Sequence, residues 1–513
     1  MPTTKTKKKS PTTAKRRSSK QKTSAPKPSE ELRVAVTFRR PDDGLGLTRY
    51  GARMTSSVVM GFRPAEDTVG RALTALEKAG FKVSARSRLA VSIRGRRSDF
   101  ERLFGTKLAA YNLTADAAYS ERAFYYPPDG AAWNPDPGIS ELIDDTYIQW
   151  PHIYMDQRFN GPPSALPPQV NYHHLRVPGD VSMVINAARV HREGVTGKGV
   201  RVAMIDSGFA HNHPYFQEHG FNSSVALASG ASHADRDGNG HGTGESANLL
   251  AIAPDAIFIG VKLDNEDSQV GASVLEGFQE ALNHSPQVIS VSLGYDLCPT
   301  DFLGNRTSNQ HLTSLPNGLK ALEAEIQAAV ANGVVVVFSA GNGHVSFPGM
   351  MPVVISAGGV YVDVDGAMRA SDYASAFDSR IYPGRHVPDC CGLVGLAANH
   401  ADYVMLPIQP GCEIDERNAQ HDGTAPDDGW GVFSGTSAAA PQLAGVCALL
   451  LAANPSLTPA DVKQVIRRTC RDVTEGSANP ASNEDRGGMQ AGPGADGATG
   501  AGLVDAFAAF RQV

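Results

Sequence analysis

The segment of residues 434–451 places the strongest limit on how this chain can fold. It opens with Ser434-Gly435-Thr436-Ser437 and then runs from residue 442 to residue 451 without a charged side chain. A helix that is apolar on every side must lie inside a large domain. Ser437 would then stand at the start of a buried helix, beside unpaired backbone N–H groups and the positive end of the helix dipole. Two interpretations are open: a serine that caps a core helix, or a nucleophile placed where negative charge is favoured.

Length and composition are those of a globular protein. The chain has 513 residues, 41% of them hydrophobic and 19% charged, which suffices for roughly two or three domains. The longest apolar runs have the length of core strands, so we expect no membrane partner. Six cysteines show neither a CxxC pair nor metal-ligand spacing. They are typical of reduced, buried thiols, with disulfides left open.

Residues 1–29 form a basic tail that we expect to be disordered. Ten of the 47 Lys and Arg residues lie in the first 28 positions, which contain no acidic residue. Such charge would suit nucleic acid, but no aromatic residues alternate with the lysines, so a solubilising tail is the favoured interpretation. The apolar segment of a secretory signal is missing. We therefore expect a cytoplasmic protein, or one exported by a non-classical route.

Residues 30–150 predict a small separate α+β domain with the order β-α-β-β-α-β, which is typical of a ferredoxin-like unit. Residues 151–179 are rich in Pro and aromatic residues and predict a linker. The expected strands cover residues 32–38, 81–85, 89–93 and 107–111, and the expected helices cover residues 67–78 and 98–104, the first of them ending before Gly80 as a helix C-cap should.

From residue 180 to residue 513 the pattern changes to alternating strands and helices. Apolar strands are expected at residues 200–205, 288–293, 334–338 and 352–357, with helices at residues 274–284 and 319–332. Continuous apolar strands between helices indicate a doubly wound, mostly parallel sheet that is covered on both faces. Ligands of such sheets bind beyond the carboxyl ends of the strands. Asp206, Ser292 and Asn342 all lie at the carboxyl ends of expected strands, which predicts one shared site.

A histidine completes this constellation. His241 lies between small residues in Asp237-Gly238-Asn239-Gly240-His241-Gly242-Thr243. A serine nucleophile needs a base within hydrogen-bond reach, and that base must be oriented by a third group. We expect His241 to take the proton of Ser437 and to return it to the leaving amine, with Asp206 holding the imidazole. The Asn342 amide and the Ser437 backbone N–H would stabilise the oxyanion.

These motifs resemble those of subtilisin-like serine peptidases. The matches are Asp206-Ser207-Gly208, His241-Gly242-Thr243, Ser339-Ala340-Gly341-Asn342 and the run from Gly435 to Pro441, in the order Asp, His, Ser that subtilisins show. The resemblance implies a subtilisin-like fold for residues 180–513 and polypeptide substrates. It also implies substrate-binding roles for Ser292, Leu293, Gly294, Ala340 and Gly341, with Ser346 near the floor of the pocket for the residue before the cut bond.

Residues 89–106 resemble the activation prodomains of sedolisins of the kumamolisin type and, more loosely, subtilisin propeptides. This resemblance implies that residues 30–150 act as an intramolecular chaperone and inhibitor of a self-processing zymogen, with residues 151–179 as its processing region. An unrelated α+β module is the alternative. Sedolisins use a glutamate as base and an aspartate for the oxyanion, whereas this chain has His241 and Asn342. The catalytic part therefore resembles the subtilisin branch, although Glu245 stands where most subtilisins have a different residue.

Metal and cofactor expectations are modest. We expect no cofactor for the chemistry. Residues 235–240 fit the first half of an EF-hand loop, but Ser246 occupies the twelfth position, where a bidentate Glu is required. We interpret the segment as the loop that presents His241, and we leave a structural Ca²⁺ site open, with ligands unknown. Residues 381–429 and 475–500 are expected to be insertions, the first of them near the substrate rim.

The sequence therefore predicts a serine endopeptidase that hydrolyses peptide bonds through an acyl-enzyme. Two other classes stay open. One is a protease-fold scaffold protein kept inactive by its retained prodomain, and the other is an intracellular protease that a partner switches on. The complete set of Asp206, His241, Asn342 and Ser437 argues against the scaffold, because a binding protein needs none of these four groups in place.

Overall fold

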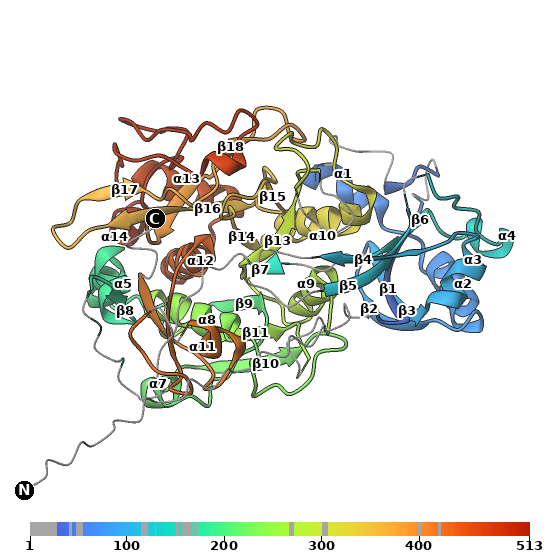
Figure 1. Cartoon of the computed structure of the whole chain (residues 1–513), viewed down its shortest axis with the longest axis horizontal. Coiled ribbons are helices and arrows are strands. Elements are labelled where there is room, and N and C mark those ends of the chain that lie inside the picture. The colour runs from blue at the N-terminus through green and yellow to red at the C-terminus, as the bar shows by residue number, and fades with distance from the viewer. Residues whose placement is uncertain are drawn as a thin grey trace, which may run out of the picture.

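The computed structural model describes residues 28–39, 44–47, 55–113, 122–128, 130–149, 153–154, 167, 170, 172–265, 271–299, 306–397, 403–418 and 422–513. A larger body is formed by the chain from residue 172 onward, and a smaller N-terminal module lies beside it (Figure 1). The tail of residues 1–29 and the linker of residues 151–179, for which we made predictions, lie mostly outside the described residues.

A mostly parallel sheet forms the centre of the larger body. Its strand order is β10-β11-β9-β12-β14-β16-β17, and β20 pairs with β16 off this path. Only the β16–β17 pairing is antiparallel. The strands are β9 (Arg201–Asp206), β10 (Ser223–Leu227), β11 (Ile257–Lys262), β12 (Val288–Val291), β14 (Val335–Ser339), β16 (Ile355–Val362), β17 (Met368–Ala370) and β20 (Cys390–Leu393). The central strands are buried on both faces, as their continuous apolar sequences predict.

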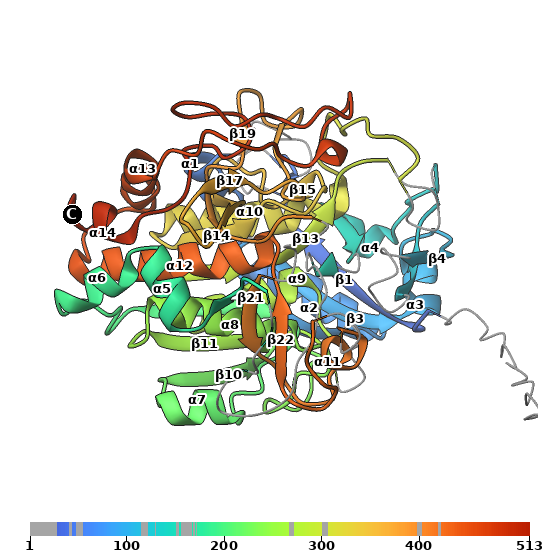
Figure 2. The same ribbon diagram turned by 60° about the vertical axis from the view of Figure 1, so that its left-hand side comes forward.

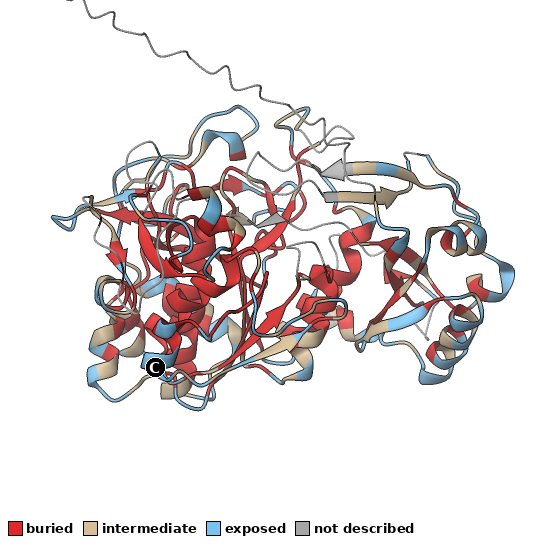
Figure 3. Ribbon diagram, turned by 60° about the horizontal axis from the view of Figure 1, so that its bottom comes forward, coloured by how far each residue is buried: buried red, intermediate tan, exposed pale blue. Residues whose placement is uncertain are grey.

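Helices cover both faces of this sheet, so the predicted doubly wound α/β class is confirmed. On one face α8 (His241–Ile252) and α12 (Thr436–Ala453) pack together (Figure 2). On the other face lie α9 (Val274–Asn283) and α10 (Lys320–Ala331). Among the described residues α12 alone is long and apolar enough to cross a membrane, but 89% of it is buried inside the fold. Buried residues fill the interior of the larger body (Figure 3). The helix α12 is therefore the core helix that its sequence predicts.

The N-terminal module is built on a four-stranded antiparallel sheet with the order β2-β3-β1-β6. Its strands are β1 (Glu31–Thr37), β2 (Lys82–Arg86), β3 (Ala90–Arg96) and β6 (Asp145–Ile148). The helices α2 (Glu66–Lys78) and α3 (Arg97–Leu103) pack on the sheet through Val69, Leu76 and Phe100. These elements follow the β-α-β-β-α-β order along the chain.

One strand of this module is not where the sequence placed it. The predicted last strand, residues 107–111, corresponds to β4 (Ala109–Leu113), which pairs only with β5 (Arg122–Tyr126) in a separate hairpin. The fourth place in the sheet belongs to β6, whose Ile148 is 4% exposed and joins the module core. The burial of β6, which is distant in the sequence from its partner β1, therefore determined the pairing. The local sequence pattern did not determine it.

The open face of the N-terminal sheet packs against α9 and α10 (Figure 1). Ser84 Oγ donates to Glu276 Oε1 at 2.7 Å, and Ser92 Oγ donates to Gln279 Oε1 at 2.8 Å. Glu276 also closes the capping box of Ser273 at the start of α9. The interface thus includes polar pairs that join residues far apart in the sequence.

All six cysteines carry free thiols, and five of them are buried. Burial raises the pKa of Cys391 and of Cys412 well above the ordinary value of a thiol. Cys390 and Cys391 lie in β20, a fully buried strand of the central sheet. The segment of residues 381–429 is therefore only in part an insertion, because it supplies one strand of the core.

Candidate active site

The three groups expected at the site lie at the ends of core elements. Asp206 is the last residue of β9, His241 is the first residue of α8, and Ser437 is the second residue of α12. The residues before the two helices are Gly240, with φ 95°, and Gly435, with φ 108°. Side chains disfavour this backbone region, which glycine adopts at little cost. The N-cap of α12 is Gly435, without a side-chain hydrogen bond, so the interpretation of Ser437 as a capping serine is wrong.

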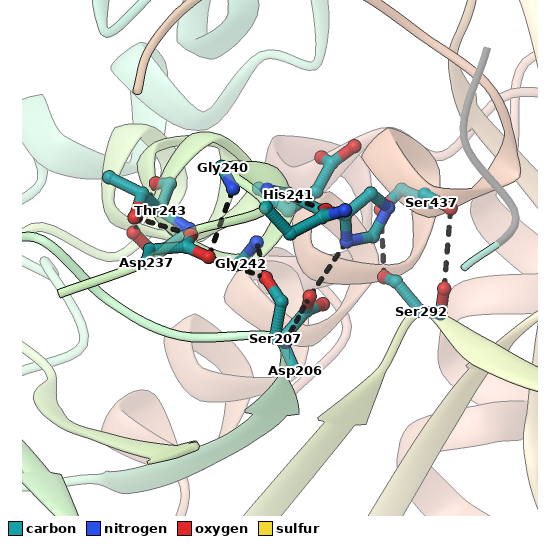
Figure 4. Close-up of polar contacts among 12 residues, drawn as sticks. Asp206, Ser207, Asp237, Gly240, His241, Gly242, Thr243, Ser292 and Ser437 are labelled. Carbon is teal, nitrogen blue, oxygen red and sulfur yellow. Dashed lines mark hydrogen bonds and ion pairs between the residues drawn. The ribbon is translucent and has the colours of Figure 1, made fainter. Parts of the chain in front are cut away.

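His241 and Asp206 are in direct contact. His241 Nδ1 lies 2.7 Å from Asp206 Oδ1, and both side chains are fully buried. The imidazole ring lies between the Asp206 carboxylate and Ser437 (Figure 4). A carboxylate at this distance accepts the Nδ1 proton, which fixes both the tautomer and the ring orientation. Nε2 is then the nitrogen that can accept a proton from a neighbouring group.

Asp237 organises the loop that precedes His241. Its Oδ1 accepts hydrogen bonds from Ser207 Oγ and from the backbone N–H of Gly240, both at 2.9 Å. Its Oδ2 accepts from the backbone N–H of Thr243 at 2.9 Å and from Thr243 Oγ1 at 2.6 Å. These four hydrogen bonds connect the loop with Ser207 after β9 and with the first turn of α8 (Figure 4). This agrees with the interpretation of residues 235–240 as the loop that presents His241.

Ser437 is held at the beginning of α12 by two contacts with Ser292. Ser292 Oγ donates to the carbonyl oxygen of Ser437 at 2.9 Å, and Ser437 Oγ donates to the carbonyl oxygen of Ser292 at 3.3 Å (Figure 4). The helix start surrounds the Ser437 hydroxyl with backbone N–H groups that have no partner within the helix. The positive end of the helix dipole therefore favours negative charge at this point.

Asn342 faces the same helix start from the loop after β14. Its Oδ1 accepts hydrogen bonds from Thr436 N at 2.9 Å and from Thr436 Oγ1 at 3.2 Å. Thr436 Oγ1 also accepts a hydrogen bond from the backbone N–H of Gly341 at 3.0 Å. With the carbonyl side of the amide occupied by Thr436, its NH₂ group is the side that can serve a ligand oxygen.

The residues predicted to bind substrate lie in or next to β13 (Leu293–Asp296), β14 and β15 (Ser346–Phe347), close to Ser437 and Asn342. Ser292 precedes β13, which lies between β15 and β7 (Ile153–Tyr154). Leu293 pairs with Tyr154 and Gly294 pairs with Ile153, both antiparallel. An extended segment from the N-terminal part of the chain thus adds a strand to β13 (Figure 1).

The other three residues of that set are buried beside the site. Ala340 and Gly341 directly follow β14, and Ser346 opens β15 opposite Asp296. All three positions have almost no exposed surface. The structure therefore brings together the ten residues that the sequence singled out, while their individual roles stay predictions.

Several supporting residues escaped the sequence reasoning. Ser207, Asp237 and Thr436 belong to the sequence motifs, but the motifs do not predict their hydrogen bonds to Gly242, Gly240 and Asn342. Polar side chains at fixed places inside a motif are the signal that pointed to them. Cys412 gave no such signal. It touches the loop at Gly240, where an added Cβ would collide with its Sγ.

Among the described residues, no group of three or more His, Cys, Asp or Glu side chains is arranged to hold a metal ion. Asp237, which belongs to the expected EF-hand half, already accepts four hydrogen bonds. The structural Ca²⁺ site stays a prediction without assigned ligands.

The doubly wound sheet and a Ser, His and Asp set at its strand ends define the class of serine hydrolases with an α/β fold. Comparison with known families narrows this class. The model of the subtilase family matches residues 197–502, which is more than half of the chain, so the protein belongs to the subtilase family. It is a serine endopeptidase, and its substrates are polypeptides.

The chain is similar to several subtilisins. It is 28% identical to subtilisin E of Bacillus subtilis (strain 168) over 369 residues, which cover 68% of this chain and 77% of that protein. It is 27% identical to a subtilisin of Bacillus pumilus over 310 residues, which cover 57% of this chain and 91% of that protein.

A solved structure shares the fold. Fervidolysin from Fervidobacterium pennivorans, described as a keratinolytic enzyme related to subtilisin, matches with a TM-score of 0.55 and 17% sequence identity. The match covers 94% of this chain, and the chain spans 61% of fervidolysin. At this identity the likeness shows the fold alone.

Proposed function

We propose that Ser437, His241 and Asp206 form the catalytic triad of this endopeptidase. The observation that carries the proposal is the 2.7 Å contact of His241 Nδ1 with Asp206 Oδ1, buried next to Ser437 at the start of α12. Ser437 Oγ attacks the carbonyl carbon of the peptide bond and passes its proton to His241 Nε2. Asp206 keeps the imidazole in the required tautomer and stabilises the imidazolium that forms.

The tetrahedral intermediate then breaks down to an acyl-enzyme. The C–N bond breaks, and His241 returns the proton to the leaving amine. Water attacks the ester carbonyl of acylated Ser437 with His241 again as base, which releases the carboxylic acid and restores the enzyme. The chemistry needs no cofactor, as in other subtilases. The Asn342 amide NH₂ and the backbone N–H of Ser437 stabilise the oxyanion in both steps.

Replacement of Ser437 and Asn342 tests these roles. We expect Ser437→Ala to lose on the order of 10⁶ in turnover and Asn342→Ala to lose about 10²–10³ in kcat. The assays are hydrolysis of a chromogenic peptide and labelling by a fluorophosphonate serine probe. Ser456→Ala, which removes an exposed serine beyond the end of α12, is the matched control and should label like the wild type. Wild-type turnover in Ser437→Ala would overturn the mechanism.

We also infer that the N-terminal module is the inhibitor of its own enzyme and that the chain is a self-processing zymogen. The pairing of β7 with β13 supports this, because Ile153 and Tyr154 occupy the strand position of a peptide substrate. In the antiparallel register the C-terminal end of β7 lies beside Leu293, next to Ser292. Tyr154 is the last described residue of β7 and pairs with Leu293, so we propose that the bond cut in maturation follows Tyr154 within a few residues.

Intact mass measurement after incubation tests the zymogen proposal. The wild type should lose the N-terminal module and gain a new N-terminus soon after Tyr154, while Ser437→Ala stays full length. If the wild type takes up the serine probe but is never shortened, the site is active and the module is not a processed prodomain. If neither protein is cut or labelled, either the module blocks the enzyme until a partner releases it, or the scaffold interpretation must be adopted.

The contact of Arg94 with Glu276 offers a second test of inhibition. Arg94 Nη2 lies 3.2 Å from Glu276 Oε1, whose side chain is fully buried, and it also donates to the carbonyl oxygen of Gly271 at 3.1 Å. Removing one partner of a buried pair costs about 3–5 kcal/mol. Arg94→Ala should therefore release activity sooner during maturation. Arg71→Ala, whose ion pair with Asp67 is exposed on α2, is the matched control.

A further inference from the structure

Arg306 joins three separate segments next to the candidate oxyanion site. Its Nε and Nη2 donate to Asp296 Oδ2 at 2.6 Å and to Asp296 Oδ1 at 2.9 Å. Nη1 donates to the carbonyl oxygen of Ala481 at 2.6 Å, and Nη2 also donates to that of Gly343 at 2.7 Å. The side chains of Arg306 and Asp296 are 21% and 16% exposed, so water competes little for these bonds.

The loop that carries Asn342 is fixed at every second residue. Gly341 is bonded at both ends, because its N–H donates to Thr436 Oγ1 at 3.0 Å and its carbonyl oxygen accepts from Ser375 N at 2.8 Å. Gly343 is held through its carbonyl oxygen by Arg306. Val345 donates its N–H to Asp296 Oδ1 at 2.9 Å. Asn342 thus stands between one anchor at Gly341 and two anchors that depend on the Arg306–Asp296 pair.

The segment of residues 475–500 completes this arrangement. Asn479 packs against Gly343, where an added Cβ would lie 2.9 Å from Asn479 Nδ2. Asn479 Nδ2 also donates to the carbonyl oxygen of Tyr373 at 3.2 Å, and its Oδ1 accepts from Ala481 N at 2.8 Å. Ala481 is one of the partners of Arg306. Arg306 therefore connects this segment, which carries no catalytic motif, with the loop of Asn342.

Gly343 needs such support because its backbone is unusual. It has φ 86°, in the left-handed region, and it follows Gly341 with φ 105°. Two glycines with positive φ on either side of Asn342 give this loop a flexible backbone of its own. An oxyanion donor stabilises the transition state only when it is held in place before the reaction. A shift of about 1 Å in such a group can cost roughly 10² in rate.

We propose that Arg306, with Asp296 as its partner, is a positioning residue that holds Asn342 in the geometry required for oxyanion stabilisation, and that residues 475–500 serve as the outer support of this brace. The inference rests on the proposed role of Asn342. Arg306 touches neither the substrate nor the reacting atoms, so it acts through Gly343 and the loop.

A double-mutant cycle on the mature enzyme tests the proposal, with the active-site concentration titrated by the fluorophosphonate probe. Arg306→Ala should lower kcat by about 10- to 100-fold with KM changed less than about threefold, because the loss is confined to the transition state. In the Asn342→Ala background the same replacement should lower kcat by less than about threefold, since the group that Arg306 positions is already gone.

Each contrary result has one meaning. If Asn342→Ala leaves kcat unchanged, the proposed oxyanion role fails, and the brace fails with it. If Asn342→Ala lowers kcat but Arg306→Ala lowers it by the same factor in both backgrounds, or not at all, only the brace is overturned. A general loss of stability would act equally in both backgrounds.

Two further variants keep the test decisive. Arg380→Ala removes an ion pair with Glu484 of 2.8 Å from the same outer segment without touching the loop of Asn342, and it should keep wild-type kcat. Arg306→Lys replaces Arg306→Ala in the cycle if the alanine variant does not mature. It retains the charge but cannot form the two-pronged contact with Asp296, so it should show the same coupling to Asn342.

Discussion

Two buried histidines should each lower the free energy of unfolding of the catalytic body as the pH falls. His211 is stacked on Phe216 with ring centroids 4.1 Å apart, and its Nε2 lies 2.8 Å from Ser246 Oγ. His213 packs edge-on against Trp430, and its Nδ1 accepts a hydrogen bond from Tyr215 N at 3.1 Å. Burial lowers the pKa of His211 to about 3 and that of His213 to about 4, from an ordinary value of 6.5.

The sign and size of the effect follow from proton linkage. Below pH 6.5 the unfolded chain binds a proton at each imidazole while the folded chain does not, so stability falls as the pH drops from 6.5 toward 4. Between pH 7 and pH 5 each histidine should cost about 2 kcal/mol of unfolding free energy. Asp415 and Asp428 act in the opposite direction, because burial raises their pKa values to about 6 and about 8. The unfolding free energy of the whole protein therefore shows only the difference between these opposite contributions. Variants are needed to measure the contribution of each histidine.

Urea denaturation at pH 5, 6 and 7 in the Ser437→Ala background measures the effect without self-digestion. His213→Asn keeps an acceptor for Tyr215 N but does not titrate, so its free-energy difference between pH 7 and pH 5 should be smaller than that of its parent by about 2 kcal/mol. Combination with His211→Phe, which retains the aromatic packing on Phe216, should double the change. A pH dependence in His213→Asn that matches its parent within about 0.5 kcal/mol would refute the reasoning.

Two other perturbations give predictions of stability. Gly240→Ala forces a side chain into a backbone with φ 95° and against Cys412 Sγ, so we expect a loss of about 2–4 kcal/mol in urea denaturation and a lower kcat through displacement of His241. Asp389 is 3% exposed and accepts bonds from Arg385 at 2.6 and 2.8 Å and from Lys463 at 3.0 Å. Burial alone would raise its pKa, but these two cations hold it below the ordinary value, so Asp389→Asn should cost about 3–5 kcal/mol at pH 7, and a loss under 1 kcal/mol would contradict this.

The central strands β9, β12, β14 and β16 were predictable because strands buried on both faces are apolar along their whole length. The run of residues 334–338 is apolar at every position and became β14, buried on both faces. Four strands of this sheet, β10, β11, β17 and β20, were not predicted. Of these, β20 is short and has no helix directly before it. In the N-terminal module, β4 and β6 were exchanged, since the choice between them depends on which strand buries Ile148 and not on local alternation.

The sequence motifs predicted which residues form the site, but they did not predict the hydrogen bonds that hold these residues in place. Asp206, His241, Asn342 and Ser437 follow from strand ends and small-residue turns, because parallel strands bring their carboxyl ends to one edge. The pairs that hold these groups join segments far apart in the sequence. Asp237 accepts a hydrogen bond from Ser207 Oγ, 30 residues away in the sequence. Asn342 accepts one from Thr436 N, 94 residues away. Hydrogen bonds between such distant residues form only in the folded chain, so a local sequence pattern cannot predict them.

Residues 409–418 and residues 479–481 belong to two outer segments, and their contacts indicate a structural role for both segments. Residues 409–418 touch the His241 loop, because Glu413 N donates to the carbonyl oxygen of Gly238 at 2.8 Å and Asn239 Nδ2 donates to Glu413 Oε2 at 3.0 Å. Residues 479–481 touch the Asn342 loop through Arg306. Both loops owe their shape to glycines with positive φ, and such backbones stay in one conformation only when the surrounding structure determines it. Each segment therefore contacts a loop that presents a group with a proposed catalytic role, and shortening either segment should lower kcat more than it lowers substrate binding.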